Sequence, residues 1–561
     1  MAKNNEFDAI VVGSGITGGW AAKELCEKGL KTLVLEKGRK INHGDYPTAM
    51  QAPWEFDHHG KKTAKDVEEY PVQSTVYAFN EGTRHYWVKD VEHPYTSTAD
   101  GPSYKWIRGY HEGGRSIMWG RQCYRWSDLD FEANARDGHG VDWPIRYNEI
   151  EPWYTYVEKF VGISGRKEGI THLPDGEFLP PFEFNCVEEH FKSQLEKVYS
   201  DRKMTIGRVA NLTVPHNGRG QCQRRNLCYR GCPYGAYFSS QSATLPAATK
   251  TGNMTLMADS VVTYLNYDKE SNRVTGVRVL NAETGQETEY TAKVIFLCAS
   301  TLNSTWLLLH SANSRFPDGL ANSSGALGKY LMDHQYQAGA FAEFEGFEDQ
   351  YYFGGRPNGI YLPRFRNVTE QHPDFIRGYG YQGGASRIGS MRGAETPGIG
   401  IEFKESLMEP GPWEMRLHGF GEVLPYEDNY VRLNTEQTDV HGLPTLDIHC
   451  LHRENESIMR RDYIDQAMEM LEATGGKKIQ EFNGVDHPGF GIHEMGTARM
   501  GRDPRTSVLN KWNQSHDIPN LFVTDGACMT SASCVNPSIT YMALTARAVD
   551  FAVNQLKKME L

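Results

Sequence analysis

A glycine pattern near the start of the chain has the residue types and spacing that bind the phosphates of a dinucleotide. Gly13, Gly15 and Gly18 follow a short apolar run in G-x-G-x-x-G spacing, and Glu36 ends the next expected strand. Such glycines permit a tight turn, a close approach of the backbone to pyrophosphate and close packing of helix against strand, while the acid accepts hydrogen bonds from a ribose. The N–H groups at the start of the following helix favour an anion. The motif predicts a dinucleotide site without distinguishing FAD from NAD.

Three cysteines in the middle of the chain are a second group that could do chemistry. Cys222, Cys228 and Cys232 stand in QCQRRNLCYRGC with C-x5-C-x3-C spacing, among three arginines that would favour thiolates. Zinc sites usually present C-x2-C pairs and four ligands, so three clustered thiols match poorly, although His216 could serve as a fourth ligand. Free or structural cysteines are the remaining interpretation from the residues alone.

The elements that would position the glycine motif have the pattern of a parallel sheet. Residues 9–12 form a continuous apolar run typical of a strand buried on both faces, residues 20–25 continue as a helix, and residues 32–35 form the second strand. Alternation over residues 254–262 and then 273–281 predicts a small antiparallel hairpin. We therefore expect a nucleotide-binding sheet with an antiparallel addition.

The second half of the chain returns to this sheet twice. Residues 292–300 predict a buried strand of the nucleotide sheet, and residues 520–527 a short strand before a final helix at 537–557. Between them, residues 335–485 contain many aromatics and β-prone stretches such as NYVRLNTEQ and TLDIHC. That alternation predicts a mostly antiparallel sheet that covers the cofactor on one side.

The predicted fold class is therefore α/β, with a Rossmann-like cofactor domain and an inserted α+β substrate domain built on the antiparallel sheet. The cofactor domain is expected to be discontinuous, comprising residues 1–45, 200–335 and 486–561. Residues 336–485 form the substrate-binding domain. Residues 46–199, rich in aromatics, Gly and Pro, form a loop and linker region with cap elements.

Composition excludes several classes of protein. The chain has 561 residues, of which 39% are hydrophobic and 23% charged, as in a globular protein with a large core. A net charge of −12 argues against a nucleic-acid or anionic-membrane partner. No stretch approaches the roughly 18 unbroken apolar residues of a transmembrane helix. The first strand follows MAKNNE directly, so we expect no export signal peptide.

Six segments, spread over nearly the whole chain, resemble the glucose-methanol-choline (GMC) oxidoreductase family in the family's order. They are VVGSGITGG at 11–19, GGRSIMWGRQ at 113–122, VIFLCAS with LLLHSA at 294–312, NSSGALGKYLMDH at 322–334, HEMGTARMG at 493–501 and TDGACMTSASCVNPSITYMALTARA at 524–548. The resemblance implies FAD as the dinucleotide and a flavin-attachment loop within residues 46–199.

The resemblance also implies a pair of catalytic residues at the reactive edge of the flavin, His493 and Asn536. An imidazole titrates near neutral pH and can take the proton of a hydroxyl while a hydride leaves for the flavin N5. An amide does not titrate, but its NH2 group can donate to the substrate oxygen and orient it. Asn before Pro537 is also a favoured helix cap, an alternative that is compatible with the same position.

Further residues are assigned to the cofactor by the same resemblance. The full set is Gly13, Gly15, Gly18, Glu36, Gly114, Ser116, Met118, Val262, Asp525, Asn536, Pro537 and Ser538. Met118 occupies the position at which some sugar oxidases of the family attach FAD through a histidine. Because Met cannot form that bond, we predict non-covalent FAD. Trp119 beside it is expected either to contact the flavin or to pack in the core.

The cysteine segment resembles that of bacterial GMC sugar dehydrogenases with a three-iron four-sulfur cluster. A cluster at Cys222, Cys228 and Cys232 would pass electrons one at a time to an acceptor, so we expect a dehydrogenase that works with a small accessory subunit and a cytochrome c-type partner. Co-export with that subunit would place the enzyme in the periplasm; without it the enzyme would be cytoplasmic.

The predicted reaction is the oxidation of a secondary CH–OH group of a sugar or glycoside, with C3 of a glucoside as the specific candidate. The forms CVNPSIT and HEMGTARMG most resemble glucoside 3-dehydrogenases and pyranose 2-oxidases. Gln335 and Tyr336 are the expected substrate contacts. The alternatives are a pyranose 2-oxidase-like oxidase that uses oxygen, a hydroxynitrile-lyase-like member without net redox chemistry, and a non-catalytic electron-transfer module.

Overall fold

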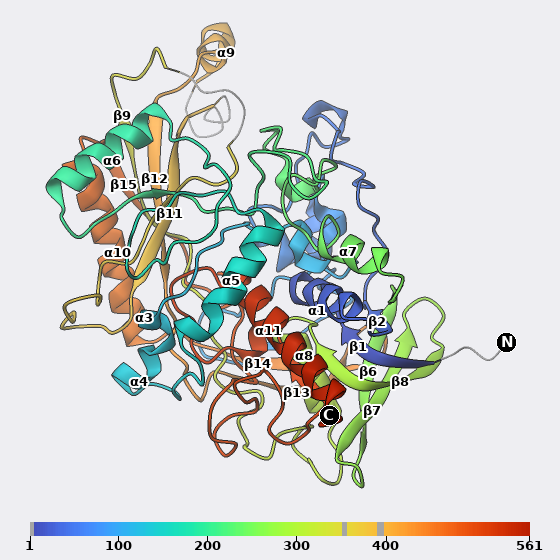
Figure 1. Ribbon diagram of the computed structural model, residues 1–561. Helices are drawn as coiled ribbons and strands as arrows, with labels where there is room; N and C mark the ends of the chain where they lie inside the picture. Colours follow the sequence, from blue (N-terminus) through green and yellow to red (C-terminus); the bar gives the residue numbers. More distant parts are fainter. Residues whose placement is uncertain (1–4, 351–355, 390–397) are drawn as a thin grey trace.

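The computed structural model describes residues 5–350, 356–389 and 398–561. Two sheets dominate the architecture, and they lie in different parts of the molecule, the second one at the upper left of Figure 1. No helix within the described residues is long and apolar enough to cross a membrane. The site is positioned by these two sheets and the loops between them.

The first sheet has a parallel part built from segments far apart in the sequence. In spatial order its strands are β5 (Met254–Met257), β2 (Thr32–Leu35), β1 (Glu6–Val12), β8 (Glu287–Leu297) and β16 (Leu521–Val523). Val12 pairs with both Leu35 and Leu297, so these three strands end level at one edge. The carboxyl ends of parallel strands are where this kind of sheet binds a nucleotide.

An antiparallel addition extends this sheet. β6 (Ser260–Asp268) pairs with β7 (Arg273–Asn281), and β7 pairs with the first half of β8. The expected hairpin over 254–262 and 273–281 is therefore partly wrong, because residues 254–257 run parallel to β2 as an edge strand. The hairpin itself begins at Ser260, after a turn in which Asp259 has a positive φ of 51°.

Helices cover the parallel strands. They are α1 (Ile16–Glu27), α7 (Thr244–Lys250), α8 (Thr301–His310) and α11 (Ser538–Lys557), with α5 (Tyr147–Val161) packed against α11. Apolar side chains of β1, α1 and α11 form one continuous core, for example Val11, Ala22 and Val549, which are all fully buried. Helices α1 and α11, from the first and last parts of the described chain, thus pack against each other (Figure 1).

The second sheet is antiparallel throughout. Its strands are, in order, β15 (Lys477–Asn483), β9 (Ala338–Phe344), β12 (Trp413–Gly421), β11 (Tyr379–Arg387), β10 (Ile360–Leu362) and β4 (Thr205–Ile206). Two helices pack on one face, α6 (Cys186–Val198) and α10 (Glu454–Ala473). The sheet and its helices include residues outside the expected range of 336–485. Strand β4 comes from the region assigned to the cofactor domain, and helix α6 comes from the region assigned to the linker.

Alternation along β12 gives the second sheet two different faces. Trp413, Met415 and Leu417 are fully buried under the helices. His418 and Phe420 alternate with them and line a cavity on the opposite face. A strand has a side-chain period of two, so the same strand both anchors the core and presents side chains to a ligand.

A third, three-stranded sheet was not expected. It contains β13 (Tyr430–Thr438), β14 (Pro444–His449) and β3 (Thr96–Ser97). The stretches NYVRLNTEQ and TLDIHC therefore form their own hairpin, and their assignment to the large antiparallel sheet is wrong. The physical reason is their apolar face, which is buried with Leu302 and Trp106 beside α8.

The remaining helices lie outside these layers. They are the short α2 (Ala64–Glu69), α3 (Asp128–Phe131) and α4 (Ala133–Asp137), and α9 (Gly400–Met408), which projects at the top of Figure 1.

Candidate active site

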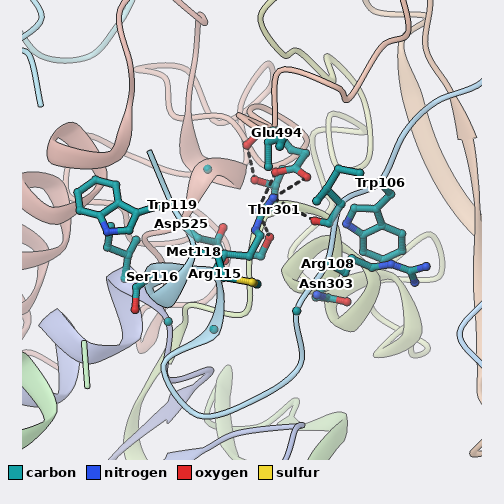
Figure 2. A pocket seen from close by; sticks show the side chains of 18 of the residues that line it. Trp106, Arg108, Arg115, Ser116, Met118, Trp119, Thr301, Asn303, Glu494 and Asp525 are labelled. Carbon is teal, nitrogen blue, oxygen red and sulfur yellow. Dashed lines mark hydrogen bonds and ion pairs between the residues drawn. The ribbon is translucent and has the colours of Figure 1, made fainter. Parts of the chain in front are cut away.

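A cavity of about 610 Å³ is lined by residues of both large sheets. Val12 and Leu35 line it at the carboxyl ends of β1 and β2, and Gln382 and His418 line it from the second sheet. Its size and its position at strand ends are those of a cofactor and substrate site. Figure 2 shows part of its wall.

The glycine motif forms an open cradle at one end of this cavity. Gly13 has a φ of +96°, and a Cβ there would lie 2.5 Å from the carbonyl oxygen of Cys298. At Gly18 a Cβ would lie 1.9 Å from the carbonyl oxygen of Gly13, so this glycine permits the close contact of helix and strand. A Cβ at Gly15 would meet nothing within 4 Å. The free space at Gly15, in front of the N-terminus of α1, suits a pyrophosphate.

Glu36 lies next to the cradle with its carboxylate fixed. It accepts hydrogen bonds from the Ser14 backbone N (3.1 Å), the Ser14 hydroxyl (2.6 Å) and the Gly38 backbone N (3.0 Å). Burial raises the pKa of Glu36, against these hydrogen bonds, which lower it. Glu36 lines the cavity and has the position expected of a ribose ligand.

His493 lines the same cavity from a loop between the two sheets. Its backbone N and that of Gly491 donate to the two carboxylate oxygens of Asp333, each at 2.8 Å. Its Nδ1 lies 3.0 Å from Nδ1 of His334. Burial, followed by the neighbouring His334 and Arg115, lowers the pKa of His493 well below its ordinary value. The imidazole is therefore neutral at physiological pH and able to accept a proton.

Asn536 also lines the cavity, and its amide is held in one orientation. Its Oδ1 accepts a hydrogen bond of 2.7 Å from Nε2 of Gln382 on β11. The side-chain NH2 of Asn536 remains available to a ligand. The capping alternative is wrong, because the cap of α11 is Pro537, the helix begins at Ser538, and no side chain bonds to its first turn.

A partly buried ion pair in the cavity wall, next to His493 in the chain, was not expected from the sequence. Arg115 donates to both carboxylate oxygens of Glu494, at 3.0 and 2.7 Å, and to the Ser300 hydroxyl at 3.1 Å (Figure 2). Thr301 donates to the backbone carbonyl of Glu494. The pair ties the segment GGRS to the segment HEMG, two motifs whose contact no spacing in the sequence indicates.

Most of the other predicted cofactor residues lie in the cavity wall. They are Gly114, Ser116, Met118, Val262, Asp525 and Ser538. Ser304 donates to Asp525 over 2.5 Å, and burial raises the pKa of Asp525 to about 6. Gly18 and Pro537 are not in the wall: Gly18 permits the close contact of helix and strand, and Pro537 precedes the first residue of α11. Trp119 packs against the hydrophobic core, which was one of its two expected roles, and it also lines the cavity; its Nε1 donates to the Phe238 carbonyl at 2.8 Å.

Of the two expected substrate contacts, only Tyr336 faces the cavity. Its ring lies 5.1 Å from that of Phe420 and 6.1 Å from that of His418, forming an aromatic wall. Gln335 is fully buried and donates to Asp486 at 2.7 Å instead, so its expected contact with the substrate is wrong. It points away because successive residues of an extended chain face opposite sides. Gln382, His418 and Phe420 were not found from the sequence, because only pairing of β11 with β12 brings them to the site.

The three cysteines surround a second cavity of about 40 Å³. Cys222, Cys228 and Cys232 all line it, while Tyr229, next to Cys228, lines the large cavity. Within the described part of the chain, no three His, Cys, Asp or Glu side chains are arranged to hold a metal ion. His216 bonds to the Lys159 carbonyl at 2.8 Å and does not line the cysteine cavity, which removes the expected fourth ligand of a zinc site.

Arg121 lies between the two cavities. It is buried and lines the large one, and its guanidinium carbon lies 5.3 Å from the ring of Tyr229 and 5.5 Å from that of Tyr237. Tyr237 in turn lines the cysteine cavity. The contact of Arg121 with Tyr237 therefore connects the walls of the two cavities.

Comparison with known proteins matches most of the chain to two models of one family. A model described as GMC oxidoreductase matches residues 7–336, and a second of the same description matches residues 425–545. A 2-methyl-1,2-propanediol dehydrogenase of Mycolicibacterium austroafricanum is 29% identical, with 98% of this chain and 95% of the relative covered. A fructose dehydrogenase large subunit of Gluconobacter japonicus is 28% identical, with 98% of both covered.

Solved structures share the fold. Pyridoxine 4-oxidase from Mesorbium loti has a TM-score of 0.60 at 17% identity, covering 97% of this chain and 98% of that one. A formate oxidase of Aspergillus oryzae has a TM-score of 0.62 at 14% identity, covering all of both chains. At these identities the likeness concerns the architecture alone.

Proposed function

Since the chain belongs to the GMC oxidoreductase family of FAD-dependent enzymes that act on CH–OH donors, we propose that it oxidises a secondary hydroxyl of a sugar or glycoside, with C3 of a glucoside as the specific candidate. The observation that carries the proposal is the meeting of His493 and Asn536 in one cavity with the glycine cradle. The two residues come from different loops, and both present a polar group to a ligand in that space.

The chain's own groups fit FAD. The free space at Gly15 and the N-terminus of α1 would hold the pyrophosphate, and Glu36 the ribose. Bound FAD supplies the hydride acceptor for the hydrogen on the carbinol carbon. Met118 offers a thioether where a covalent link would need an imidazole, which supports non-covalent binding.

The residues of the site divide the proton chemistry between them. His493, neutral because of burial and of the nearby Arg115, takes the hydroxyl proton at Nε2. Asn536 donates its NH2 to the same oxygen and holds the carbinol in place. Tyr336 and Phe420 form an aromatic wall against which the apolar face of a sugar ring would stack.

We further propose that the cysteine cavity holds a three-iron four-sulfur cluster. Cys222, Cys228 and Cys232 surround a common space and would supply the thiolates that hold the cluster, which would pass on electrons one at a time. Electrons would leave toward an acceptor, as in a dehydrogenase. A relative named as a large subunit supports an accessory subunit. We propose a cytochrome-type acceptor in addition, and co-export with the accessory subunit would give a periplasmic location.

The test is to mix the purified yellow protein anaerobically with a panel of glucosides, simple sugars and diols. Bleaching of the flavin by a glucoside, with a 3-keto product identified by NMR, is the expected result. Bleaching only by other alcohols would contradict the substrate assignment, and a product formed without bleaching would indicate a lyase. Rapid reoxidation by air in a sample without iron would indicate an oxidase.

A further inference from the structure

The hydrogen bonds of His334 determine which ring nitrogen of His493 carries its hydrogen. Nε2 of His334 lies 3.2 Å from the backbone carbonyl oxygen of Ala532. A carbonyl only accepts, so Nε2 of His334 carries the hydrogen. Burial lowers the pKa of His334 to about 4, so the ring is neutral and its other nitrogen, Nδ1, is an acceptor.

The same reasoning fixes the proton on His493. Its Nδ1 lies 3.0 Å from Nδ1 of His334, with the two rings inclined at 72°. Because His334 can only accept at this atom, Nδ1 of His493 must donate. Nε2 of His493 is then unprotonated, and it has no hydrogen-bond partner within the described residues.

We infer that His334 is a positioning residue that locks His493 in the tautomer protonated at Nδ1, with Nε2 bare and facing the substrate hydroxyl. The chain of contacts runs from the Ala532 carbonyl through both rings to the cavity. When the O–H bond of the alcohol breaks and its proton joins Nε2, the Nδ1–H bond to His334 becomes charge-assisted and stronger. His334 does not touch the substrate, since it does not line the cavity.

The carboxylates beside the two histidines do not compete with His334 for Nδ1 of His493. Asp333 and Glu494, the carboxylates next to the two histidines in the chain, have other partners: Asp333 accepts from the backbone N of His493, and Glu494 pairs with Arg115. A catalytic histidine commonly relies on a carboxylate at Nδ1. Here a neutral ring takes that place, which fixes the tautomer without adding a negative charge beside the site.

This inference rests on the proposed function for its kinetic consequence but has an independent readout. In the holoenzyme labelled with 15N-histidine, the His493 signals are assigned by comparison with His493→Gln. We expect a directly bonded proton on Nδ1 and none on Nε2. Finding the proton on Nε2 would overturn the inference whatever the substrate proves to be.

The kinetic arm compares three variants by stopped-flow reduction of the flavin. His334→Leu removes the acceptor and is expected to slow the limiting rate by about 10²–10⁴-fold, the scale seen when a catalytic histidine has the wrong tautomer. His334→Asn places an amide oxygen near the former Nδ1 and should recover at least ~10-fold of that loss, by restoring the acceptor.

The matched control is His190→Leu, which also removes a ring nitrogen bonded to a backbone carbonyl, that of Thr474 at 3.1 Å, but outside both cavities. Equal rates for His334→Leu and His190→Leu would overturn the inference, as would equal loss in His334→Leu and His334→Asn. If His334→Leu does not fold, the inference is tested by the tautomer of His493 in the wild-type protein and by the rate of flavin reduction in His334→Asn. If no alcohol bleaches the wild-type flavin, the proposed function fails while the tautomer measurement still stands.

Discussion

Gln382 on β11 and Asn536 before α11 are joined by a hydrogen bond of 2.7 Å from the Gln382 amide nitrogen to the Asn536 amide oxygen. The contact links the second sheet to the cofactor layer at the point where a substrate would bind. It also determines which end of the Asn536 amide faces the cavity. The orientation of the Asn536 amide therefore depends on a strand of the other sheet.

Gln382→Glu tests this relationship directly. A carboxylate only accepts, so it would draw the NH2 of Asn536 toward itself and turn the amide oxygen to the substrate hydroxyl. We expect the rate of flavin reduction to fall by about 10²-fold, because a donor to the reacting oxygen is replaced by an acceptor. Gln382→Met, which leaves the amide free to rotate, should lose less, and equal losses in both variants would contradict the assignment.

His493→Gln should abolish most of the chemistry while the protein keeps its colour. Removal of a general base typically costs about 10²–10⁴-fold in rate. FAD content should be unchanged, because the cradle at Gly15 and Glu36 is made by other segments. Anaerobic flavin reduction measures the rate, and the visible spectrum measures FAD content. A rate within ~3-fold of the wild type would show that His493 is not the general base.

The acid limb of the pH profile should lie below that of an ordinary histidine. The pKa of His493 is lowered well below 6.5 by burial, by His334 and by Arg115. The base must be unprotonated to act, so activity is retained as the pH falls through 6.5 and is lost only at lower pH. The limiting rate of flavin reduction between pH 5 and pH 8 measures this.

Asp333 is the group that could add a second limb to this profile. Burial raises its pKa to about 7, and its carboxylate holds the backbone of the His493 loop. The profile should therefore be recorded for Asp333→Asn as well. A limb at pH 6.5 or above that persists in Asp333→Asn would contradict the lowered pKa of His493.

Two glycine substitutions should separate cofactor binding from folding. Gly15 has a φ of −64°, which any residue adopts, and its missing Cβ faces open space. Gly15→Ala should thus fold but bind FAD weakly, because the methyl group fills the cradle. In Gly18→Ala the methyl carbon meets the Gly13 carbonyl oxygen at 1.9 Å, so we expect about 3 kcal/mol or more of lost stability.

The absorbance of bound flavin measures FAD binding, and urea unfolding measures stability, in Gly15→Ala, Gly18→Ala and the wild type. Full flavin content in Gly15→Ala would show that the cradle does not contact the pyrophosphate. Equal stability of Gly18→Ala and the wild type would show that helix α1 can move away from β1.

Replacement of the cysteines should affect the exit of electrons and not their entry. Cys228→Ser is expected to lower the iron content while the substrate still bleaches the flavin, since the cysteine cavity is separate from the large one. Turnover with a one-electron acceptor such as ferricyanide should then fall by about 10-fold or more. Iron analysis and steady-state assays check this. Cys186→Ser, a free thiol outside both cavities, is the control.

The sequence by itself determined the dinucleotide motif, the family resemblance and the general plan of two sheets, one parallel and one antiparallel. These are local properties: G-x-G-x-x-G followed by Glu36 specifies a turn, a helix start and a strand end within about thirty residues of chain. Tyr336 was also found from its position after a motif. Gln335 was wrongly assigned because neighbours in an extended segment face opposite sides. Which of the two faces the cavity depends on how that segment packs in the folded protein.

Only the tertiary structure decided the contacts that tune the site. The pairing of His334 with His493, of Gln382 with Asn536 and of Arg115 with Glu494 joins residues more than 150 positions apart in the chain. Such contacts follow from strand register and loop docking, which are set by burial of apolar faces across the whole fold. The same cause separates the β13–β14 hairpin from the large sheet, since its apolar side chains find their cover beside Leu302 and Trp106.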